Sequence, residues 1–355
     1  ELPLVLGLKD KLEEHGMKVF GPSKLAAQLE GSKFFARNFC KRYNVPQPKF
    51  KCFTDLKEAK KEIKRLNGYC VVKADGLAGG KGVIVCDNID EAIHASKQIL
   101  EEKKFGQAGN AILIEERITG IEASIFVVSD GENAILIGSA QDHKRAFDND
   151  LGPNTGGMGA YSPTPFSENK LLNRVGGEII QPTLNAMYDR GHPYRGFLYV
   201  GIMIVDGNPN VIEFNVRLGD PETQVILPLL KSSLFELLWN ATEGKLKKTK
   251  VVTSGKTAVS VVLASEGYPN KYKKGMKIEG LDKLKDELIF HAGTKQEGHH
   301  IVTNGGRVLN VVGIGESLSA AIKDAYRIVG LVEFENKFYR NDIGLRGMRV
   351  NKKGA

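Results

Sequence analysis

The sequence predicts an α/β protein that folds as several subdomains. Its 355 residues are too many for a single hydrophobic core, and this length indicates two to four subdomains. Helical segments that begin with capping signals, Asp55 with Glu58 and Asn88 with Glu91, alternate with strand-like runs of period two. The 40 glycines indicate several loops in which the backbone approaches something closely.

The composition is that of a globular protein with a basic balance. The formal net charge is +8, but the basic residues are dispersed, and between Leu56 and Asn67 lysine is mixed with glutamate as on an ordinary solvated surface. A basic balance suits anionic small substrates. Aromatic residues are not interleaved with arginine as they are in single-strand binders, so no nucleic-acid partner is expected.

Cysteine usage and hydropathy indicate a cytoplasmic protein that is not anchored in a membrane. No apolar run approaches the length of a membrane span, and no signal-peptide pattern precedes the first strand. The chain opens on Glu1 and not on Met, as though cut from something longer. The cysteines are widely spaced, and we expect buried free thiols in a reducing compartment. They are Cys40, Cys52, Cys70 and Cys86.

Residues 1–50 are predicted to form a helix, a short strand at Lys18–Phe20 and further helix. Ser32 is a candidate N-cap for a helix that continues to Tyr43. Lys33 lies in the first turn of that helix, where the macrodipole disfavours a cation. Two interpretations stay open for Lys33: it reaches a phosphate, or it is an ordinary solvated lysine.

Residues 51–119 are predicted to form an α/β unit around a glycine-rich hairpin. This hairpin carries Lys73 at a strand end and Lys81 in the loop, which suits backbone N–H groups laid over a polyphosphate. It is not a Walker A loop, because Asp75 stands where the first glycine should be and Gly82 replaces the Ser/Thr. It is not the dinucleotide fingerprint, because a strand follows it and not a helix. The predicted strands are Tyr69–Lys73, Gly82–Cys86 and Ala111–Glu115.

The last of these strands runs from apolar residues into charged ones, and Gly120 and Glu122 follow. Two interpretations fit this segment equally. One is a hinge that offers backbone groups to an adenine edge and the Glu122 carboxylate to ribose hydroxyls. The other is an ordinary crossover with exposed acidic residues.

Residues 120–250 are predicted to form a larger catalytic half. A hairpin turns at Ser129–Glu132, and its second strand ends in Gln141–Arg145. The loop Gly152–Gly159 has four glycines in eight positions and resembles an anion nest. The other predicted elements are a helix over Glu168–Arg190, strands over Phe197–Val205 and Asn210–Val216, and helical segments over Glu222–Leu230 and Leu234–Thr242.

The strand that begins at Asn210 carries the pattern on which the functional prediction depends. A carboxylate, a carboxamide and a guanidinium on one face are costly to bury unless a partner compensates them. A hard cation with a phosphate is such a partner, since two oxygen ligands stand at i and i+2 and an arginine follows for the anion. The alternative is a solvated strand face with a Glu–Arg ion pair. Period two sends Ile212, Phe214 and Val216 to one face, and Glu213, Asn215 and Arg217 to the other.

A β-rich region is expected after the polar run Glu243–Thr253, which indicates a boundary. The seven histidines show no ligand spacing, and His299 with His300 is expected in a solvated turn. Neither a Gly-x-Ser-x-Gly elbow nor a Cys/His pair placed for nucleophilic catalysis is present. The predicted elements are strands over Thr257–Ala264, Leu288–His291 and Arg307–Val312, and a helix over Ser319–Val329.

Four motifs together resemble the phosphoribosylamine–glycine ligase family (glycinamide ribonucleotide synthetases), ATP-grasp enzymes of purine biosynthesis. They are Lys73–Ala78, Gln141–Arg145, Gly152–Tyr161 and Glu213–Glu222. The resemblance covers nearly the whole chain, to about Arg346. It implies an α/β (α+β) ATP-grasp fold with two subdomains that clasp ATP. The implied parts are the remainder of an N-terminal α/β domain (1–50), a small subdomain with the glycine-rich flap (51–119), a large subdomain (120–250) and a C-terminal domain (251–350).

The resemblance also implies the residues of a nucleotide site and of a substrate site. The resemblance implies that Lys33 and Lys73 contact the nucleotide phosphates, under a flap with Gly79, Gly80 and Lys81. The adenine is implied to contact Glu115, Glu116, Arg117 and Ile118, and the ribose Glu122. Glu213 and Asn215 are implied to hold a metal ion that bridges the phosphates. The substrate assignments are Asn154 near the γ-phosphate and the acceptor, Arg217 and Asp220 for orienting glycine, and Asp142 and Lys144 facing the amine.

The implied reaction joins glycine to 5-phosphoribosylamine at the expense of ATP. It passes through glycyl phosphate and gives glycinamide ribonucleotide, ADP and phosphate. ATP and Mg²⁺ (or Mn²⁺) are the expected cofactors, and a monomer that acts on small molecules is expected. Two alternatives stay open: another ATP-grasp carboxylate–amine ligase of purine metabolism, and a truncated nucleotide-binding fragment without turnover.

Two departures from the family pattern bear on these expectations. Position 79 is Gly where the family usually has Ala, in a flap that is already flexible. The opening glycine-rich strand–loop–helix that helps to hold the ribose 5′-phosphate is absent, which leads us to expect an incomplete substrate site.

Overall fold

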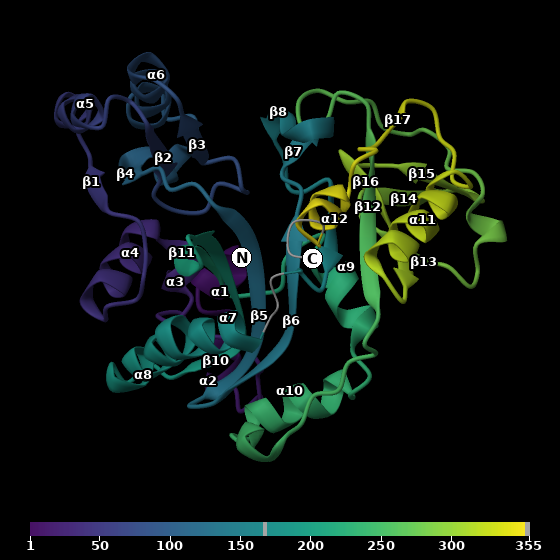
Figure 1. Cartoon of the computed structure of the whole chain (residues 1–355), viewed down its shortest axis with the longest axis horizontal. Coiled ribbons are helices and arrows are strands. Elements are labelled where there is room, and N and C mark those ends of the chain that lie inside the picture. The colour runs from purple at the N-terminus through teal and green to yellow at the C-terminus, as the bar shows by residue number, and fades with distance from the viewer. Residues whose placement is uncertain (166–168, 352–355) are drawn as a thin grey trace. The chain divides into compact units, whose positions relative to one another are not determined.

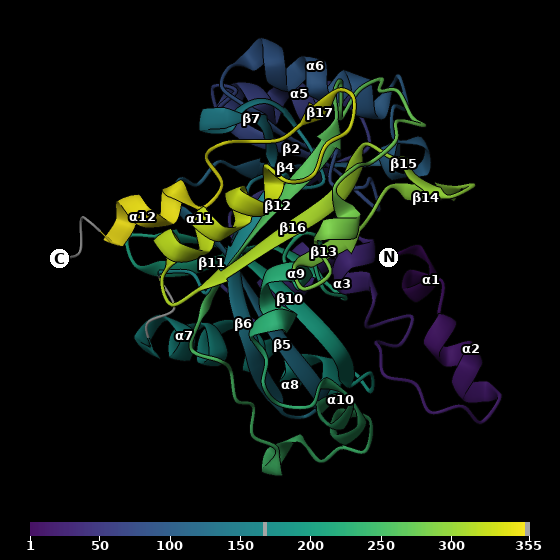
Figure 2. The same ribbon diagram turned by 90° about the vertical axis from the view of Figure 1, so that its right-hand side faces the viewer.

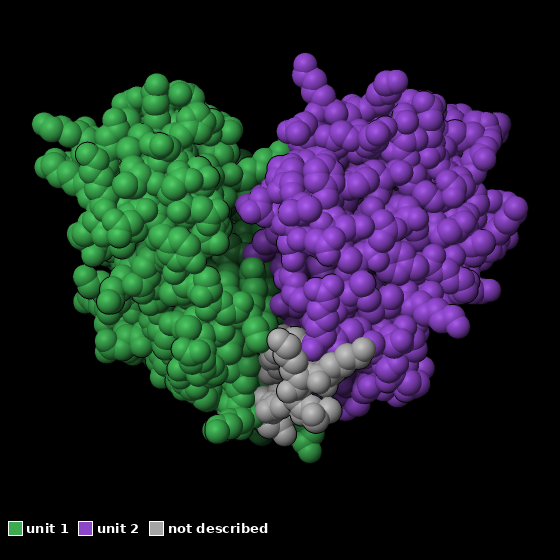
Figure 3. Space-filling model, turned by 45° about the horizontal axis from the view of Figure 1, so that its top comes forward, with its two compact units in different colours: residues 1–136, 168–218, 234–250 green, residues 137–167, 219–233, 251–355 purple. Residues whose placement is uncertain are grey.

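The chain passes five times between two units, and each unit contains both strands and helices (Figures 1 and 3). The computed structural model describes residues 1–165 and 169–351. Unit 1 comprises residues 1–136, 168–218 and 234–250, and unit 2 comprises residues 137–167, 219–233 and 251–355.

Unit 1 contains a four-stranded antiparallel sheet in the order β1-β4-β2-β3, covered by helices α5 and α6 (Figure 1). The side chains of Asp55 and Asn88 accept hydrogen bonds from the backbone N–H groups of Glu58 and Glu91, which confirms both predicted N-caps. The apolar faces of the helices then pack on the sheet. The elements are β1 (Phe50–Phe53), α5 (Leu56–Arg65), β2 (Cys70–Ala74), β3 (Val83–Cys86), α6 (Ile89–Leu100) and β4 (Ile112–Glu116).

A second group of antiparallel strands in unit 1 has the order β11-β10-β5. Helix α8 packs against β10, helix α10 against β5, and helices α3 and α4 against β11. A π-helical segment at 176–180 joins α7 to α8, and the predicted helix start at Glu168 lies outside the described residues. The elements are α1 (Leu2–Val5), α2 (Leu8–Glu14), α3 (Gln28–Gly31), α4 (Lys33–Arg42), β5 (Ile121–Gly131), α7 (Asn169–Val175), α8 (Gln181–Asp189), β10 (Tyr194–Val205), β11 (Asn208–Asn215) and α10 (Leu234–Thr242).

Unit 2 is built on the antiparallel strands β9-β12-β16-β13, with β17 beside β12. Figure 2 shows the long strands β12 and β16 side by side, and helix α11 packs against both. The last two residues of β6 pair with β9. The elements are β6 (Ala134–Asp142), β7 (Arg145–Phe147), β8 (Leu151–Asn154), β9 (Gly159–Ser162), α9 (Thr223–Ile226), β12 (Thr257–Ser265), β13 (Leu288–His291), β14 (Thr294–Glu297), β15 (His300–Thr303), β16 (Arg307–Gly315), α11 (Leu318–Val329), β17 (Lys337–Phe338) and α12 (Leu345–Asn351).

Most predicted elements are confirmed with shifts of a few residues at their ends, but one prediction was wrong. Lys18–Phe20 is not a strand, because no strand among the described residues pairs with it. Phe20 instead packs edge-on against Phe197, with ring centroids 5.0 Å apart. The hairpin turn predicted at Ser129–Glu132 is present one residue later, at Asp130–Asn133, between β5 and β6. Asp130 Oδ1 accepts hydrogen bonds from the backbone N–H groups of Glu132 and Asn133, at 3.1 and 2.8 Å, and so fixes that turn.

The cysteines are free, and Cys40, Cys70 and Cys86 are buried as expected, whereas Cys52 is half-buried. Within residues 1–165 and 169–351, the helices are all too short or too polar to cross a bilayer.

Candidate active site

Lys73 lies at the end of β2 in a buried group of three charged side chains. Its Nζ is 2.7 Å from Glu115 Oε2, and Arg37 donates to the same carboxylate from Nε and Nη2, at 2.7 and 2.8 Å. None of the three side chains is more than 9% exposed. Because two cations share one carboxylate, the group carries an excess positive charge where water screens it little.

A β-bulge in strand β11 gives this group its backbone partners. Gly201 pairs with Glu213 and Ile202 pairs with Val211, so Ile212 is an extra residue without a partner of its own in β10. The carbonyl of Ile212 accepts hydrogen bonds from Arg37 Nη2 at 2.8 Å and from Lys73 Nζ at 3.1 Å. The bulge also corrects the prediction that Ile212 shares the buried face: Ile212 is half-buried, while its neighbour Val211 is buried.

The buried group perturbs the titration of both Lys73 and Glu115. Burial lowers the pKa of Lys73 to about 8, against the opposing effect of the Glu115 carboxylate, and Arg37 adds to the lowering. Burial would raise the pKa of Glu115, but Lys73 and Arg37 outweigh it and hold that pKa at about 2. Lys73 is therefore a cation whose charge is costly until a further anion approaches it.

The start of helix α4 is held by the glycine-rich hairpin. Ser32 caps the helix as predicted, and the Asp75 carboxylate accepts from Ser32 Oγ and from the backbone N–H of Phe34, both at 3.0 Å. Lys33 Nζ donates to the carbonyl of Gly76 at 3.0 Å. Burial lowers the pKa of Lys33, and the Glu213 carboxylate is the largest influence in the opposite direction. Lys33 is therefore not the freely solvated lysine of the second interpretation.

The hairpin tip consists of Gly79, Gly80 and Lys81, and all three residues are exposed. The φ angles of Gly79 and Gly80 are 55° and 75°, in the left-handed region that favours glycine. A side chain at position 79 would meet open space, so the backbone conformation and not the available room favours glycine there.

After the bulge, β11 presents Glu213 and Asn215 on the face opposite the buried Phe214, as predicted. Arg217 Nη2 donates to Asn215 Oδ1 at 3.2 Å and to Glu30 Oε1 at 2.9 Å. Two oxygen-bearing side chains at i and i+2 fit a hard cation that takes its remaining ligands from phosphate and water. Among the described residues, no group of three or more His, Cys, Asp and Glu side chains is placed so that it could hold a metal ion.

The segment from the end of β4 to the start of β5 has side chains that already contact other parts of unit 1. Glu116 Oε1 accepts from the backbone N–H of Lys49 at 3.1 Å. Arg117 is ion-paired with Asp87 and lies over the Tyr69 ring, 4.5 Å from its centroid. Ile118 and Glu122 are half-buried. The roles of this segment toward adenine and ribose stay predictions.

In unit 2, Arg307 connects two of the motifs that the sequence singled out. Its Nη1 donates to the carbonyls of Gly156 and Asp220, both at 2.7 Å, and its Nη2 is 3.0 Å from Asp220 Oδ2. A Cβ at Gly157 would lie 2.5 Å from Pro221 Cδ, so the glycine loop can approach Asp220 this closely only without a side chain there. We call Arg307, Asp220 and the Gly156–Gly157 backbone the Arg307 clamp.

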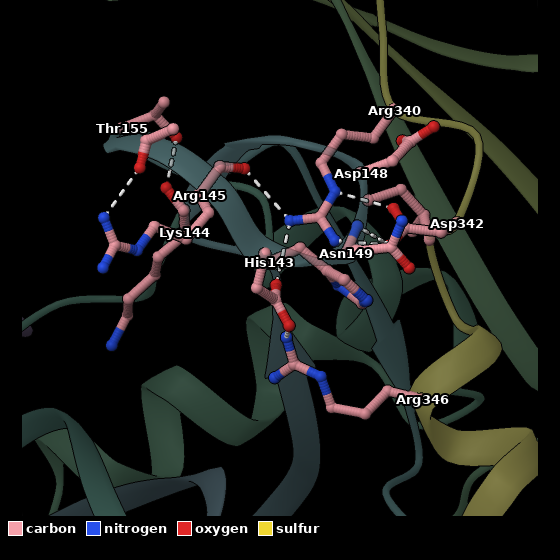
Figure 4. A network of polar contacts seen from close by, with 12 residues as sticks. His143, Lys144, Arg145, Asp148, Asn149, Thr155, Arg340, Asp342 and Arg346 are labelled. Atoms are coloured by element: carbon pink, nitrogen blue, oxygen red, sulfur yellow. Dashed lines mark hydrogen bonds and ion pairs between the residues drawn. The ribbon is translucent and has the colours of Figure 1, made fainter.

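The structure brings Lys144 and Asn154 to one hairpin. Asn154 in β8 pairs with Arg145 in β7. Thr155 donates to the Lys144 carbonyl from its backbone N–H and from its Oγ1, at 2.7 and 2.8 Å (Figure 4). Asp142 ends β6 and is buried opposite Ala160. These three predicted substrate residues therefore lie along one continuous strand and loop of unit 2.

Sequence reasoning missed Arg37 and Arg307. Arg37 lies on a helix whose residues read as an ordinary amphipathic segment, and its partner Glu115 is 78 positions away. The available signal was an arginine that directly follows three apolar residues, 34–36. For Arg307 the available signal was the pair of glycines that precedes it, Gly305 and Gly306, which is typical of a closely approached backbone.

Comparison with protein families gives two matches that together cover most of the chain. Residues 31–223 match the ATP-grasp (A) domain of phosphoribosylglycinamide synthetase, and residues 258–346 match the C domain of the same enzyme.

Curated relatives agree with these matches. A phosphoribosylamine–glycine ligase of Caldanaerobacter subterraneus subsp. tengcongensis is 45% identical over 343 residues, which cover 97% of this chain and 82% of the relative. One from Vibrio vulnificus is 47% identical and covers 98% of this chain and 82% of the relative. A bifunctional purine biosynthetic protein of Dictyostelium discoideum is 45% identical, and the match covers 98% of this chain but 46% of that protein.

Solved structures give the same fold. The phosphoribosylamine–glycine ligase of Thermotoga maritima has a TM-score of 0.84 and 38% identity, with 91% of this chain and 81% of that chain covered. The N5-carboxyaminoimidazole ribonucleotide synthetase of the same organism has a TM-score of 0.60 at 17% identity, with 91% of this chain and 77% of that chain covered, and shows the shared fold alone. The ATP-grasp fold expected from the sequence is confirmed, and the chain belongs to the phosphoribosylglycinamide synthetase family.

Proposed function

We propose that the protein is an ATP-dependent ligase that joins glycine to 5-phosphoribosylamine. The products are glycinamide ribonucleotide, ADP and phosphate, and the reaction serves purine biosynthesis. The observation that carries the proposal is the similarity to curated phosphoribosylamine–glycine ligases, at 45% identity or more over nearly the whole chain. Both family domains, ATP-grasp and C, are present in the expected order.

The chemistry explains why no side-chain nucleophile is needed. A carboxylate is a poor acyl donor, because hydroxide or oxide would have to leave. Transfer of the γ-phosphoryl group of ATP to the glycine carboxylate gives an acyl phosphate and ADP. The amine of 5-phosphoribosylamine then attacks the acyl carbon, phosphate leaves, and an amide forms. Both steps place negative charge on the phosphoryl oxygens, so fixed cations supply most of the catalysis.

In unit 1 we assign the nucleotide phosphates to Lys73 and Lys33, under the flap of Gly79, Gly80 and Lys81. The buried excess positive charge around Lys73 supports this assignment, because an approaching phosphate stabilises the charged ammonium. Burial of Lys33 beside the flap supports its assignment in the same way.

Glu213 and Asn215 would hold the Mg²⁺ or Mn²⁺ ion. When bound, that ion neutralises charge on the phosphates. Arg217, which donates to Asn215 Oδ1, holds the amide oxygen in place and supplies a further positive charge. We assign adenine to the backbone and side chains of Glu115, Glu116, Arg117 and Ile118, and the ribose to Glu122.

For the substrates we keep the assignments that the sequence suggested. Arg217 and Asp220 orient glycine, Asp142 and Lys144 face the amine, and Asn154 lies near the γ-phosphate and the acceptor. The Arg307 clamp supports the choice of Asp220, because the guanidinium fixes the carboxylate and the adjacent glycine loop together.

The test is a steady-state assay of this chain with ATP, Mg²⁺, glycine and freshly generated 5-phosphoribosylamine. We expect one ADP and one glycinamide ribonucleotide per glycine consumed. Product formation that depends on bicarbonate or formate in place of glycine would instead identify another ATP-grasp ligase. ATP binding by calorimetry without phosphate release, with both substrates present, would identify a non-catalytic nucleotide-binding fragment.

We further propose a monomer in the cytoplasm. The free buried thiols of Cys40, Cys70 and Cys86 support a reducing compartment. Light scattering coupled to size exclusion measures the oligomeric state; a mass near twice the 38.9 kDa of the chain would contradict the monomer.

A further inference from the structure

The loop that follows strand β12 carries a side chain, Tyr268, that contacts the glycine loop of unit 2. The Oη of Tyr268 accepts a hydrogen bond from the backbone N–H of Gly156 at 3.0 Å. The carbonyl of Gly156 accepts a hydrogen bond from Arg307 Nη1 at 2.7 Å. Both polar backbone groups of Gly156 are therefore held by side chains that lie 112 and 151 positions further along the chain.

These two hydrogen bonds contribute more to the geometry of the loop than to the stability of the fold. Gly156 is exposed, so water would satisfy its N–H and its carbonyl if the two side chains did not. Exchanging a water partner for a protein partner at an exposed peptide group changes the free energy of unfolding little. The exchange does restrict the backbone, and the two side chains therefore determine where the glycine loop lies.

The position of Tyr268 is fixed by the segment that carries Arg307. A Cβ at Gly306 would lie 2.2 Å from Tyr268 Cδ2, so the tyrosine ring packs on the backbone directly before Arg307, where only glycine leaves room. The backbone N–H of Tyr268 donates to the carbonyl of Ser265 at 3.1 Å, and the N–H of Ser265 donates to the carbonyl of Gly306 at 2.8 Å. The Tyr272 ring packs edge-on against Tyr268, with centroids 6.3 Å apart. The tyrosine and the arginine that hold Gly156 therefore belong to one local structure.

This local structure joins the glycine loop to Asp220, the residue that we assign to orienting glycine. Arg307 Nη1 donates to the carbonyl of Asp220 at 2.7 Å, and Arg307 Nη2 is 3.0 Å from Asp220 Oδ2. The next loop residue, Gly157, has a φ of 108° and lies so close to Pro221 that a side chain would not fit between them. A displacement of the glycine loop is therefore transmitted to the segment that contains Asp220.

We propose that Tyr268 is a positioning residue for the ligase reaction. Its hydroxyl holds the Gly156 peptide, and through that peptide it keeps the glycine loop and Asp220 in the arrangement that binds glycine. The inference rests on the proposed function, since it concerns the glycine substrate of that reaction. Tyr268 acts through Gly156 and not by contact with the substrate.

The variant Tyr268→Phe tests this role, because it removes the hydroxyl and keeps the ring that packs on Gly306. We expect KM for glycine to rise about three- to tenfold through loss of one neutral hydrogen bond. KM for ATP should stay the same, because the ATP contacts are assigned to unit 1. Steady-state assays of the full chain, with each substrate varied in turn, measure both constants. A variant that only folds less well would lose kcat and leave both KM values unchanged.

Tyr272→Phe is the matched control. It removes a hydroxyl from the ring that packs against Tyr268, and within residues 1–165 and 169–351 that hydroxyl makes no hydrogen bond. We expect both KM values of this variant to equal those of the unaltered protein.

Two further measurements test the route through Gly156. In a double-mutant cycle with Arg307→Lys, the losses in kcat/KM for glycine should combine to less than their product, because both side chains hold the same peptide. Amide hydrogen exchange followed by NMR needs no turnover. The Gly156 amide should exchange faster in Tyr268→Phe and at an unchanged rate in Tyr272→Phe, because only the first variant removes its acceptor.

The outcomes separate this role from the proposed function. An unaltered chain that does not consume glycine would contradict the proposed function, and the role of Tyr268 with it. If the unaltered chain consumes glycine, an unchanged KM for glycine in Tyr268→Phe, or an equal rise in both KM values, would overturn the role of Tyr268 alone. Unchanged exchange of the Gly156 amide, or losses that multiply in full, would also overturn it.

Discussion

Two clusters of arginine and carboxylate, one in each unit, differ in their charge balance. In unit 1, Arg37 and Lys73 share the single carboxylate of Glu115, and all three side chains are buried. In unit 2, Arg340 and Arg346 face Asp150 and Asp342, whose side chains are 43% and 20% exposed. Buried ion pairs that are balanced hold a structure together, whereas an uncompensated buried cation is tolerated where an anionic ligand completes it. The difference separates a ligand-binding cluster from a bracing one.

The largest effect is expected for a variant that tests whether unit 1 binds the metal ion and the nucleotide. Glu213→Ala should lower kcat by roughly three orders of magnitude, because the metal contributes several kcal/mol of transition-state stabilisation. The thermal unfolding midpoint should fall only modestly, because Glu213 is half-buried, although its carboxylate favours the charged form of Lys33. Glu297→Ala, on the exposed hairpin of unit 2, is the matched control. Unchanged kcat in Glu213→Ala would contradict the metal assignment.

The two arginines themselves give the next prediction. Arg37→Met should reduce the free energy of unfolding by roughly 3–5 kcal/mol, because it removes the bidentate partner of a fully buried carboxylate. Arg340→Met should cost less, about 1–3 kcal/mol, because Asp150 and Asp342 are left partly hydrated. Urea denaturation followed by circular dichroism measures both. If Arg340→Met is the more destabilising variant, the contrast between the clusters is wrong.

A substitution in the Arg307 clamp should have a smaller effect on activity, and it distinguishes a role in positioning the substrate from a role in stabilising the fold. Arg307→Lys keeps the charge but cannot span Gly156 and Asp220 at once, and we expect kcat/KM for glycine to fall about 10- to 100-fold. The unfolding free energy should change by less than about 1 kcal/mol, because the side chain is partly exposed. Arg327→Lys, an exposed ion-paired arginine on α11, is the control. Equal loss of activity in both variants would remove Arg307 from the site.

The sequence predicted what short-range patterns determine. The N-caps at Ser32, Asp55 and Asn88 and the polar face of Glu213 and Asn215 follow from residues a few positions apart, and the structure contains them. Helix α10 was predicted with the same bounds. In each case the chemistry that fixes the element lies within one or two turns of it.

What the sequence could not show depends on distant partners. The bulge at Ile212 is set by the register with β10, and it directs a carbonyl toward Arg37, a residue 175 positions away. The short strands β7 and β8 have polar residues and little alternation, and pairing with each other is what makes them strands. The roles of the predicted nucleotide and substrate residues stay predictions, since they depend on ligands.

The pH dependence of nucleotide binding gives the smallest effect and tests the charge excess directly. With a pKa of about 8 in the free protein, Lys73 loses its proton as pH rises through that value, and affinity for ATP should fall by up to about tenfold per pH unit above it. The free energy of unfolding changes with pH in the opposite direction. The pKa of Lys73 in the folded protein lies below the ordinary lysine value of 10.5, so between pH 8 and 10.5 the unfolded chain binds more protons than the folded one. The contribution of Lys73 to stability therefore rises with pH over this range. Calorimetric ATP titrations from pH 7 to 10 measure the first effect, and urea midpoints over the same range measure the second. Lys73→Gln should bind ATP weakly without the alkaline limb. An affinity that stays flat across this range in the unaltered protein would mean that Lys73 does not face the phosphates, and the buried charge excess of unit 1 would then have a structural role only.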